Sequence, residues 1–174
     1  MTEAVANRRK PFDTREMRDV LSSFATGVTI VTTSDAQGLP VGITASSFNS
    51  VSMDPPLILW SLRLEATYYP VFSIAERFVV NILAEDQVDV SNRFAKSYVN
   101  RFGGQAYHAG LGDLPLLSGC AAHLECRTEA VYPGGDHAIF LGRVERISTS
   151  DKAPLAFGKG RYMVVAPQDV TVHN

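Results

Sequence analysis

The chain has 174 residues, 45% of them apolar and 20% charged, with a formal net charge of -2. This is the composition of one ordinary globular domain, and the small negative charge argues against a basic nucleic-acid surface. No apolar run approaches the roughly 20 residues that a membrane-spanning helix needs, and residues 1–10 lack the apolar centre of a signal peptide, so we expect no membrane partner.

The N-terminal region predicts an arm followed by a helix. We expect residues 1–12 to form a flexible arm and residues 13–174 to form a single domain. Asp13 is a residue type that caps helices, and Glu16 completes a capping-box pattern three residues later. A short amphipathic helix ended by Gly27 is therefore predicted. Its apolar positions, which recur at helical spacing, are Met17, Leu21 and Phe24.

Strands dominate the rest of the chain. β-branched and apolar runs alternate with turn residues, and Asp54-Pro55-Pro56 is a strong break because proline cannot donate a hydrogen bond to a sheet. A further strand segment is expected at Ser50–Met53. The main predicted strands are Val28–Thr33, Leu39–Phe48, Leu57–Leu62, Arg77–Leu83, Cys120–Val131, Ala138–Ile147 and Tyr162–Val165.

Short helices and one long loop separate these strands. A helical turn is predicted within Glu65–Ala75, with Pro70 near its start. A helix is predicted within Glu85–Lys96, with Val88, Phe94 and Ala95 as inward positions. The polar segment Ser97–Gly112 is a candidate functional loop. This pattern of strands favours an antiparallel barrel or sandwich over a parallel α/β sheet.

The two cysteines are predicted to be reduced. Cys120 and Cys126 lie six residues apart in one predicted strand, and would therefore be about 20 Å apart, too far for a disulfide. We expect both thiols to act as small core residues in a reducing, cytoplasmic setting.

The stretch Gly42–Ser52 is unusually rich in hydroxyls. In an extended strand Thr44 and Ser46 share one face, while Ala45 and Ser47 share the other. Small hydroxyl side chains offer hydrogen bonds with little bulk, which suits a flat heteroaromatic ring or a phosphate. A polar edge strand facing water is the alternative interpretation.

Common site types are absent from the sequence. Neither a dinucleotide-binding G-x-G-x-x-G after a strand nor a P-loop occurs, and no G-x-S-x-G motif is present. No histidine pair has metal-ligand spacing, so we expect no metal site, and His108 and His123 are interpreted as structural or incidental.

Eight short segments, taken in order, resemble a known family. They are Phe24–Thr33, Gly42–Phe48, Val51–Leu57, Phe78–Leu83, Arg93–Ala95, Leu124–Cys126, Gly134–His137 and Gly160–Tyr162. Together they resemble the short-chain flavin reductases of two-component monooxygenases, over nearly the whole chain from about Met17 to Val165. The resemblance implies a mainly β fold: an antiparallel split β-barrel of Greek-key type, the FMN-binding split barrel, with a few short flanking helices.

The resemblance also implies a flavin site. The strand Thr44–Ser47 would supply hydrogen bonds to the polar edge of the isoalloxazine ring, and Ser61–Arg63 would form a second wall. Ala66 and Thr67 would begin a short helix at the flavin phosphate, although Ala66 stands where relatives often carry a hydroxyl or a basic residue. The implied flavin-binding residues are Gly42, Thr44, Ala45, Ser46, Ser47, Ser61, Leu62, Arg63, Ala66, Thr67, Arg93 and Phe94.

A nicotinamide nucleotide would dock against two turns. His137, oriented by Asp136, would face it as it approaches the flavin, although the turn Gly134–His137 can also be read simply as a hairpin connection. Lys159, between Gly158 and Gly160, would contact its phosphates, and Tyr162 would stack on it.

The function implied by the resemblance is an NAD(P)H-dependent flavin reductase. A hydride would pass from NADH or NADPH to N5 of FMN or FAD, and the diffusible reduced flavin would serve a separate monooxygenase; a homodimer is also implied. The alternative is a non-catalytic flavin-binding protein for storage or sensing on the same barrel. An oxidase of the pyridoxamine-phosphate type is disfavoured, since no additional cluster for a substrate phosphate is found.

Overall fold

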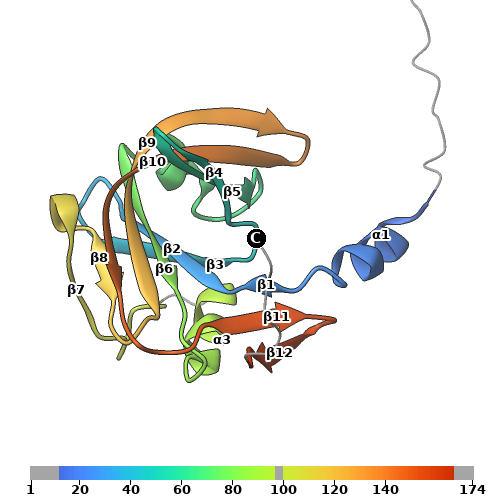
Figure 1. Ribbon diagram of the computed structural model, residues 1–174. Coiled ribbons are helices and arrows are strands. Elements are labelled where there is room, and N and C mark those ends of the chain that lie inside the picture. Colours follow the sequence, from blue (N-terminus) through green and yellow to red (C-terminus); the bar gives the residue numbers. More distant parts are fainter. Residues whose placement is uncertain (1–11, 97–99, 167–174) are drawn as a thin grey trace, which may run out of the picture.

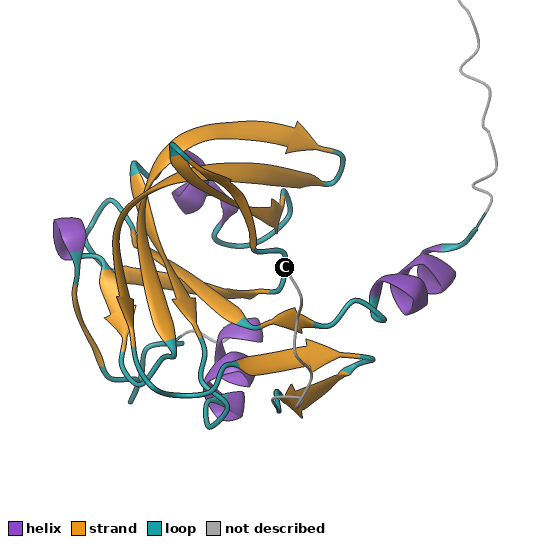
Figure 2. Cartoon of the chain, in the orientation of Figure 1, coloured by secondary structure: helices purple, strands orange, loops and turns teal. Residues whose placement is uncertain are grey.

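The computed structural model describes residues 12–96 and 100–166. Strands make up most of the regular secondary structure in these residues, as Figure 2 shows by colour. Apart from Phe12, the expected arm lies outside the described residues, as do residues 97–99 of the predicted loop.

The first helix confirms the predicted cap but is shorter than predicted. Helix α1 (Thr14–Leu21) begins after Asp13, whose carboxylate accepts a hydrogen bond from the Glu16 amide at 2.7 Å, while the Glu16 carboxylate accepts one from the Asp13 amide. The helix ends at Leu21, so Phe24 lies beyond it. None of its residues is buried, and α1 extends away from the sheets (Figure 1).

Seven antiparallel strands form the main sheet. Their spatial order is β3-β2-β6-β9-β10-β5-β4. The strands are β2 (Thr29–Ser34), β3 (Pro40–Ala45), β4 (Asn49–Met53), β5 (Pro56–Arg63), β6 (Arg77–Ile82), β9 (Ala122–Gly134) and β10 (His137–Thr149). The mainly β, antiparallel prediction is therefore confirmed. The sheet has two edges, β3 and β4, and a closed barrel is not formed by the pairings among the described residues.

Two smaller sheets contain strands that the sequence did not predict. One has the order β1-β11-β12, made of β1 (Thr26–Gly27), β11 (Leu155–Gly158) and β12 (Arg161–Val164). The other pairs β7 (Tyr107–Ala109) with β8 (Pro115–Leu117), on either side of the short 3-10 helix η1 (Leu111–Asp113). The predicted loop therefore contains a strand in its second half.

Two more helices lie between the strands. Helix α2 (Tyr69–Ile74) has Pro70 in its first turn, as predicted, but begins three residues after Ala66. Helix α3 (Val88–Ala95) buries Phe94 completely, whereas Ala95 is exposed. The inward position predicted for Ala95 is therefore wrong. No helix in the described ranges is long and apolar enough to cross a membrane.

Two of the differences between the predicted and the observed strand boundaries affect the residues singled out above. The predicted strand Leu39–Phe48 is shorter in the structure, because β3 ends at Ala45, and β4 corresponds to the further segment predicted at Ser50–Met53. Strand β9 begins at Ala122, so Cys120 lies before it, not in one strand with Cys126. Both cysteines are free and buried, as predicted.

An aromatic cluster fills the core of the main sheet. The ring of Trp60 stacks on Phe140 at 4.6 Å between centroids and meets Phe72 and Phe78 edge to face. All four side chains are almost completely buried. Successive residues of a strand point to opposite faces. Ser61 and Arg63 of β5 therefore point away from the face that carries Trp60.

Candidate functional site

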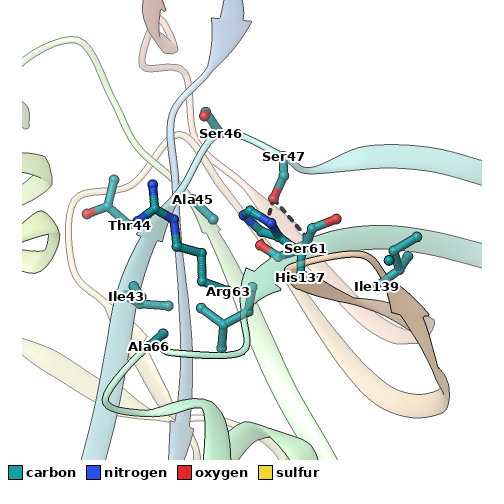
Figure 3. Close-up of a pocket in the computed structure, with 12 residues that line it drawn as sticks. Ile43, Thr44, Ala45, Ser46, Ser47, Ser61, Arg63, Ala66, His137 and Ile139 are labelled. Atoms are coloured by element: carbon teal, nitrogen blue, oxygen red, sulfur yellow. Dashed lines mark hydrogen bonds between the residues drawn. The ribbon is translucent and has the colours of Figure 1, made fainter. Parts of the chain in front are cut away.

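A cleft of about 630 Å³ lies where the end of β3 approaches β5 and the start of β10. This volume falls in the range of about 300–1,000 Å³ typical of cofactor sites. Figure 3 shows the side chains that line it. The lining residues are Ile43, Thr44, Ala45, Ser46, Ser47, Ser61, Leu62, Arg63, Ala66, Gly134, His137 and Ile139.

Both predicted walls and one predicted nicotinamide residue meet in this cleft. The residues Thr44–Ser47 and Ser61–Arg63 line it together with Ala66 and His137. Strands β5 and β10 pair antiparallel, with Arg63 directly opposite His137, which brings the two ends together. The alternation expected of a strand does not continue through Ser46 and Ser47, because β3 ends at Ala45.

The remaining predicted residues lie outside the cleft lining. They are Gly42, Thr67, Arg93, Phe94, Asp136, Gly158, Lys159, Gly160 and Tyr162. Ile43, Gly134 and Ile139 line it but were not predicted. A small glycine beside two branched apolar residues carries no distinctive signal in a β-rich sequence.

The cleft hydroxyls differ in their hydrogen bonding. Ser47 Oγ donates to the Ser61 carbonyl at 3.0 Å and accepts from the Ser61 amide at 2.9 Å, which joins the two walls (Figure 3). Thr44 Oγ1 is turned toward α3 and donates to the Ser91 carbonyl at 2.8 Å. Within the described ranges, the hydroxyls of Ser46 and Ser61 have no such partner and can serve a ligand.

The backbone of β3 presents a free edge at the cleft. The carbonyl of Ala45 points toward β2 and accepts a hydrogen bond from Thr29 Oγ1 at 2.7 Å. Backbone groups two residues apart in a strand share one edge. The amide and carbonyl of Thr44, one residue earlier, therefore face away from β2, on an edge that none of the described strands covers.

Gly42 and Phe94 pack against each other behind this edge. A Cβ atom on Gly42 would come within 2.6 Å of Phe94 Cε1, so the strand can approach α3 this closely only with glycine. Phe94 is completely buried. Both residues therefore position β3 from behind, and neither lines the cleft.

His137 and Asp136 form a pair at the turn between β9 and β10. His137 Nδ1 lies 2.7 Å from Asp136 Oδ1. This hydrogen bond to His137 lowers the pKa of the Asp136 carboxyl. Only the imidazole lines the cleft, and the carboxylate fixes its orientation from outside.

The two arginines of the prediction occupy different places. Arg63 is exposed and lines the cleft, and it forms no ion pair with an acidic residue in the described ranges. Arg93 Nη1 instead donates to the Gly103 carbonyl at 3.1 Å, away from the cleft. Arg63 is therefore the available cation at the site.

The second predicted nicotinamide loop belongs to the small sheet. Lys159 is exposed in the turn between β11 and β12. Tyr162 packs edge to face on Phe157, and its hydroxyl bonds to Ser91 Oγ at 2.9 Å and to Asn92 Oδ1 at 3.0 Å. The ring is thus already held by its own chain.

The described residues contain no cluster of three or more histidine, cysteine or acidic side chains that could hold a metal ion. The cleft instead combines small residues, two available hydroxyls, a free strand edge, an imidazole and a guanidinium. Such a set can bind a flat polar ring and a phosphate.

Comparison with known families places the chain. The model of the flavin reductase like domain matches residues 21–166. The chain belongs to the flavin reductase-like domain family.

Relatives of this flavin reductase-like domain include a reductase component of a flavin-dependent monooxygenase. It is 42% identical over 158 residues to the reductase component of the flavin-dependent trigonelline monooxygenase of Acinetobacter baylyi, covering 91% of this chain and 51% of the relative. It is 38% identical over 150 residues to the FMN reductase (NADH) SmoA of Agrobacterium fabrum, covering 86% of this chain and 85% of that one. The chain spans about half the length of two of the curated relatives it matches.

A solved structure shares the fold. The NADH:FAD oxidoreductase SgcE6 of Streptomyces globisporus C-1027, in complex with NAD and FAD fragments, superposes with a TM-score of 0.86 at 35% identity. The match covers 92% of this chain and 98% of that chain.

Proposed function

We propose that this flavin reductase-like domain is an NAD(P)H-dependent flavin reductase that supplies reduced FMN or FAD to a separate monooxygenase. The observation that carries the proposal is the cleft between β3 and β5, where eight of the twelve predicted flavin residues meet His137. The names of the relatives, which include an FMN reductase (NADH) and a monooxygenase reductase component, support it.

The β3 edge fits the polar rim of a flavin. The pyrimidine end of the ring carries a donor between two acceptors, and the carbonyl and amide of Thr44, on the free edge of β3, can bond to that donor and to one of the acceptors. Ser46 and Ser61 supply further hydroxyls, and Ala45 leaves room for close approach. We infer that the ring binds here, beside the β3 edge of the main sheet. This sheet would form part of the predicted split barrel.

The flavin phosphate is assigned to Arg63. A guanidinium binds phosphate well through paired N–H donors, and Arg63 is the arginine that lines the cleft. The start of α2 is a weaker choice, because α2 has only six residues and its first turn has no side-chain cap. Arg93 is also weaker, since it lies outside the cleft lining.

His137 is assigned to the nicotinamide side. It lies at the β10 end of the cleft, where it is the cross-strand neighbour of Arg63 on β5. Asp136 orients its ring. The imidazole would hold the incoming nucleotide against the exposed face of the flavin, while Gly158–Gly160 would contact its distal part. Tyr162 has less support as a stacking residue because its hydroxyl is bonded to α3.

The chemistry belongs to the bound cofactors: a hydride leaves C4 of the reduced nicotinamide, which is oxidised, and adds to N5 of the flavin, which is reduced. The protein's residues orient the two rings face to face. No side-chain nucleophile or base is needed at the cleft. The site is open and lightly charged, which suits a flavin that must leave after reduction.

A steady-state assay tests this proposal. Purified protein is mixed with each combination of FMN or FAD and NADH or NADPH, and loss of nicotinamide absorbance is followed. We expect a rate that scales with added flavin and saturates. Flavin binding without nicotinamide oxidation would support the alternative, a storage or sensing protein on the same fold.

We also infer a homodimer built partly on α1. Its apolar side chains Met17, Val20 and Leu21 are exposed, and a groove lined by them and Phe12 has no covering segment in the described chain. Analytical ultracentrifugation of the protein and of its Val20→Lys variant tests this, with a loss of dimer expected in the variant. A single domain over residues 13–174 and a reducing, cytoplasmic setting are the remaining proposals, the latter supported by the two buried free thiols.

A further inference from the structure

Arg101 is a buried cation just outside the cleft. The residue is only 7% exposed, and no carboxylate in the described ranges forms an ion pair with it. A buried charge without a counter-ion is costly unless other groups satisfy it. Burial lowers the pKa of Arg101, yet a guanidinium remains protonated at neutral pH. Its surroundings must therefore compensate the charge.

Three separate segments supply that compensation. Arg101 Nη1 donates to the Gly42 carbonyl at 2.7 Å, and Nε donates to the Lys96 carbonyl at 2.9 Å. The guanidinium carbon lies 4.9 Å from the centroid of the Tyr68 ring, over its face. One side chain thus contacts β3, the residue that follows α3, and the segment that precedes α2.

Two of these contacts lie next to the walls of the cleft. Gly42 shares with Thr44 the uncovered edge of β3, so the hydrogen bond to the Gly42 carbonyl is made on the edge proposed to meet the flavin. Tyr68 follows Ala66 by two residues, in the segment between Arg63 and α2. The positions of both walls are therefore linked through Arg101.

We propose that Arg101 is a positioning residue for flavin binding. It sets the distance between the β3 edge and the Arg63–Tyr68 segment at one end of the cleft, as the Ser47–Ser61 hydrogen bonds do at the other end. The inference rests on the proposed function, because the bound molecule is taken to be a flavin. Arg101 contacts the β3 edge two residues before Thr44 and does not line the cleft.

A planar guanidinium is needed for this geometry. Arginine can donate in two directions at once and lie flat on an aromatic ring, whereas lysine offers a single compact ammonium group. Lysine at this position can reach one carbonyl but cannot reproduce both hydrogen bonds and the ring contact together. Methionine retains apolar bulk and removes every donor.

The test compares Arg101→Met and Arg101→Lys with the unmodified protein. The dissociation constant for FMN is measured by quenching of flavin fluorescence, without nicotinamide, and kcat and both KM values are measured separately. For Arg101→Met we expect a rise of about tenfold in the FMN dissociation constant and KM. The kcat at saturating flavin and the NADH KM should stay within about twofold, and Arg101→Lys should give an intermediate rise.

Two further variants keep the result interpretable. Arg77→Met removes a partly exposed arginine paired with Glu145, which does not line the cleft, and should leave FMN binding unchanged. Tyr68→Leu removes only the aromatic face under the guanidinium and should raise the FMN dissociation constant about threefold. If Arg101→Met does not fold, this variant tests the positioning role in its place.

The outcomes separate the two levels of inference. Lower melting temperature with unchanged FMN affinity in the folded Arg101 and Tyr68 variants would overturn the positioning role and leave the proposed function intact. Unmodified protein that bound no flavin would overturn the proposed function, and the positioning role with it.

Discussion

Ser47 Oγ both donates to the Ser61 carbonyl, at 3.0 Å, and accepts from the Ser61 amide, at 2.9 Å. One hydroxyl therefore satisfies two backbone groups of β5 at a point where the edge strand β4 has not yet begun. The segment after β3 is attached to β5 by this side chain, and the spacing of the cleft walls depends on it.

Ser47→Ala should loosen the cleft. It leaves the amide and carbonyl of Ser61 without their partner, at a net cost of about 1 kcal/mol or somewhat more. We expect a lower melting temperature and flavin binding weakened about fivefold, measured by thermal unfolding and by titration with FMN.

Ser46→Ala is the matched control for this substitution. Ser46 is exposed and its hydroxyl has no hydrogen-bond partner among the described residues, so its loss should leave the melting temperature unchanged. Flavin binding should weaken only as far as Ser46 contacts the ligand directly. Equal losses of stability in both variants would contradict the linking role of Ser47.

Gly42→Ala should destabilise the fold. The added methyl group would lie 2.6 Å from Phe94 Cε1, against a completely buried ring. Overpacking of this kind costs about 1–3 kcal/mol, measurable by urea unfolding. Gly27→Ala is the control, since nothing lies within 4 Å of a Cβ atom there. A Gly42→Ala protein as stable as the control would show that β3 can move away from α3.

The sequence predicted the main strands because their signals are local, whereas the cleft wall Ser61–Arg63 was implied by the family resemblance alone. Runs of β-branched residues indicate strands wherever they occur, and the hydroxyl-rich segment Thr44–Ser47 does line the cleft. The strands β1, β7, β8 and β11 were missed because each has only two to four residues and none contains a run of β-branched side chains.

The predicted roles that depend on tertiary contacts were less accessible to prediction. Nothing in the sequence near Thr44 indicates that its hydroxyl bonds to Ser91, and nothing near Arg101 indicates that it reaches Gly42, 59 positions earlier. A buried arginine in a polar segment looks like a solvated one. Its partners are backbone carbonyls, and these leave no trace in the sequence.

His137→Ala should impair use of the nicotinamide more than binding of the flavin. The imidazole lies at the end of the cleft opposite the β3 edge, so its removal should raise the NADH KM several-fold while the FMN dissociation constant changes little. Asp136→Asn retains a hydrogen-bond acceptor for His137 but removes the charge, and should give a smaller rise. Parallel losses for both ligands in His137→Ala would contradict the separate roles.

Both cysteines should be unreactive in the folded protein. Burial raises the pKa of Cys120 and of Cys126 to about 12. At pH 8 only about one thiol in 10,000 would then be ionised, and the thiolate is the reactive form. Ellman's reagent should modify neither thiol until denaturant is added, when both should react rapidly. Fast labelling of the native protein would contradict the buried placement.

His123 is a buried imidazole that does not line the cleft. Its Nε2 lies 2.9 Å from the Leu117 carbonyl and its Nδ1 lies 3.1 Å from Ser148 Oγ. These partners fit a neutral ring that donates from Nε2 and accepts at Nδ1. Burial lowers the pKa of His123, so the folded state favours the neutral form.

This lowered pKa predicts a loss of stability in acid. An unfolded histidine titrates near pH 6.5, and below that pH the unfolded chain binds a proton that folded His123 resists. The free energy of unfolding should therefore fall as the pH drops below about 6.5, by at most about 1.4 kcal/mol per pH unit from this one group, until the folded pKa is reached. Urea unfolding at a series of pH values measures the slope. His123→Gln should reduce the slope in this range, and an unchanged slope in His123→Gln would assign the acid sensitivity to other groups.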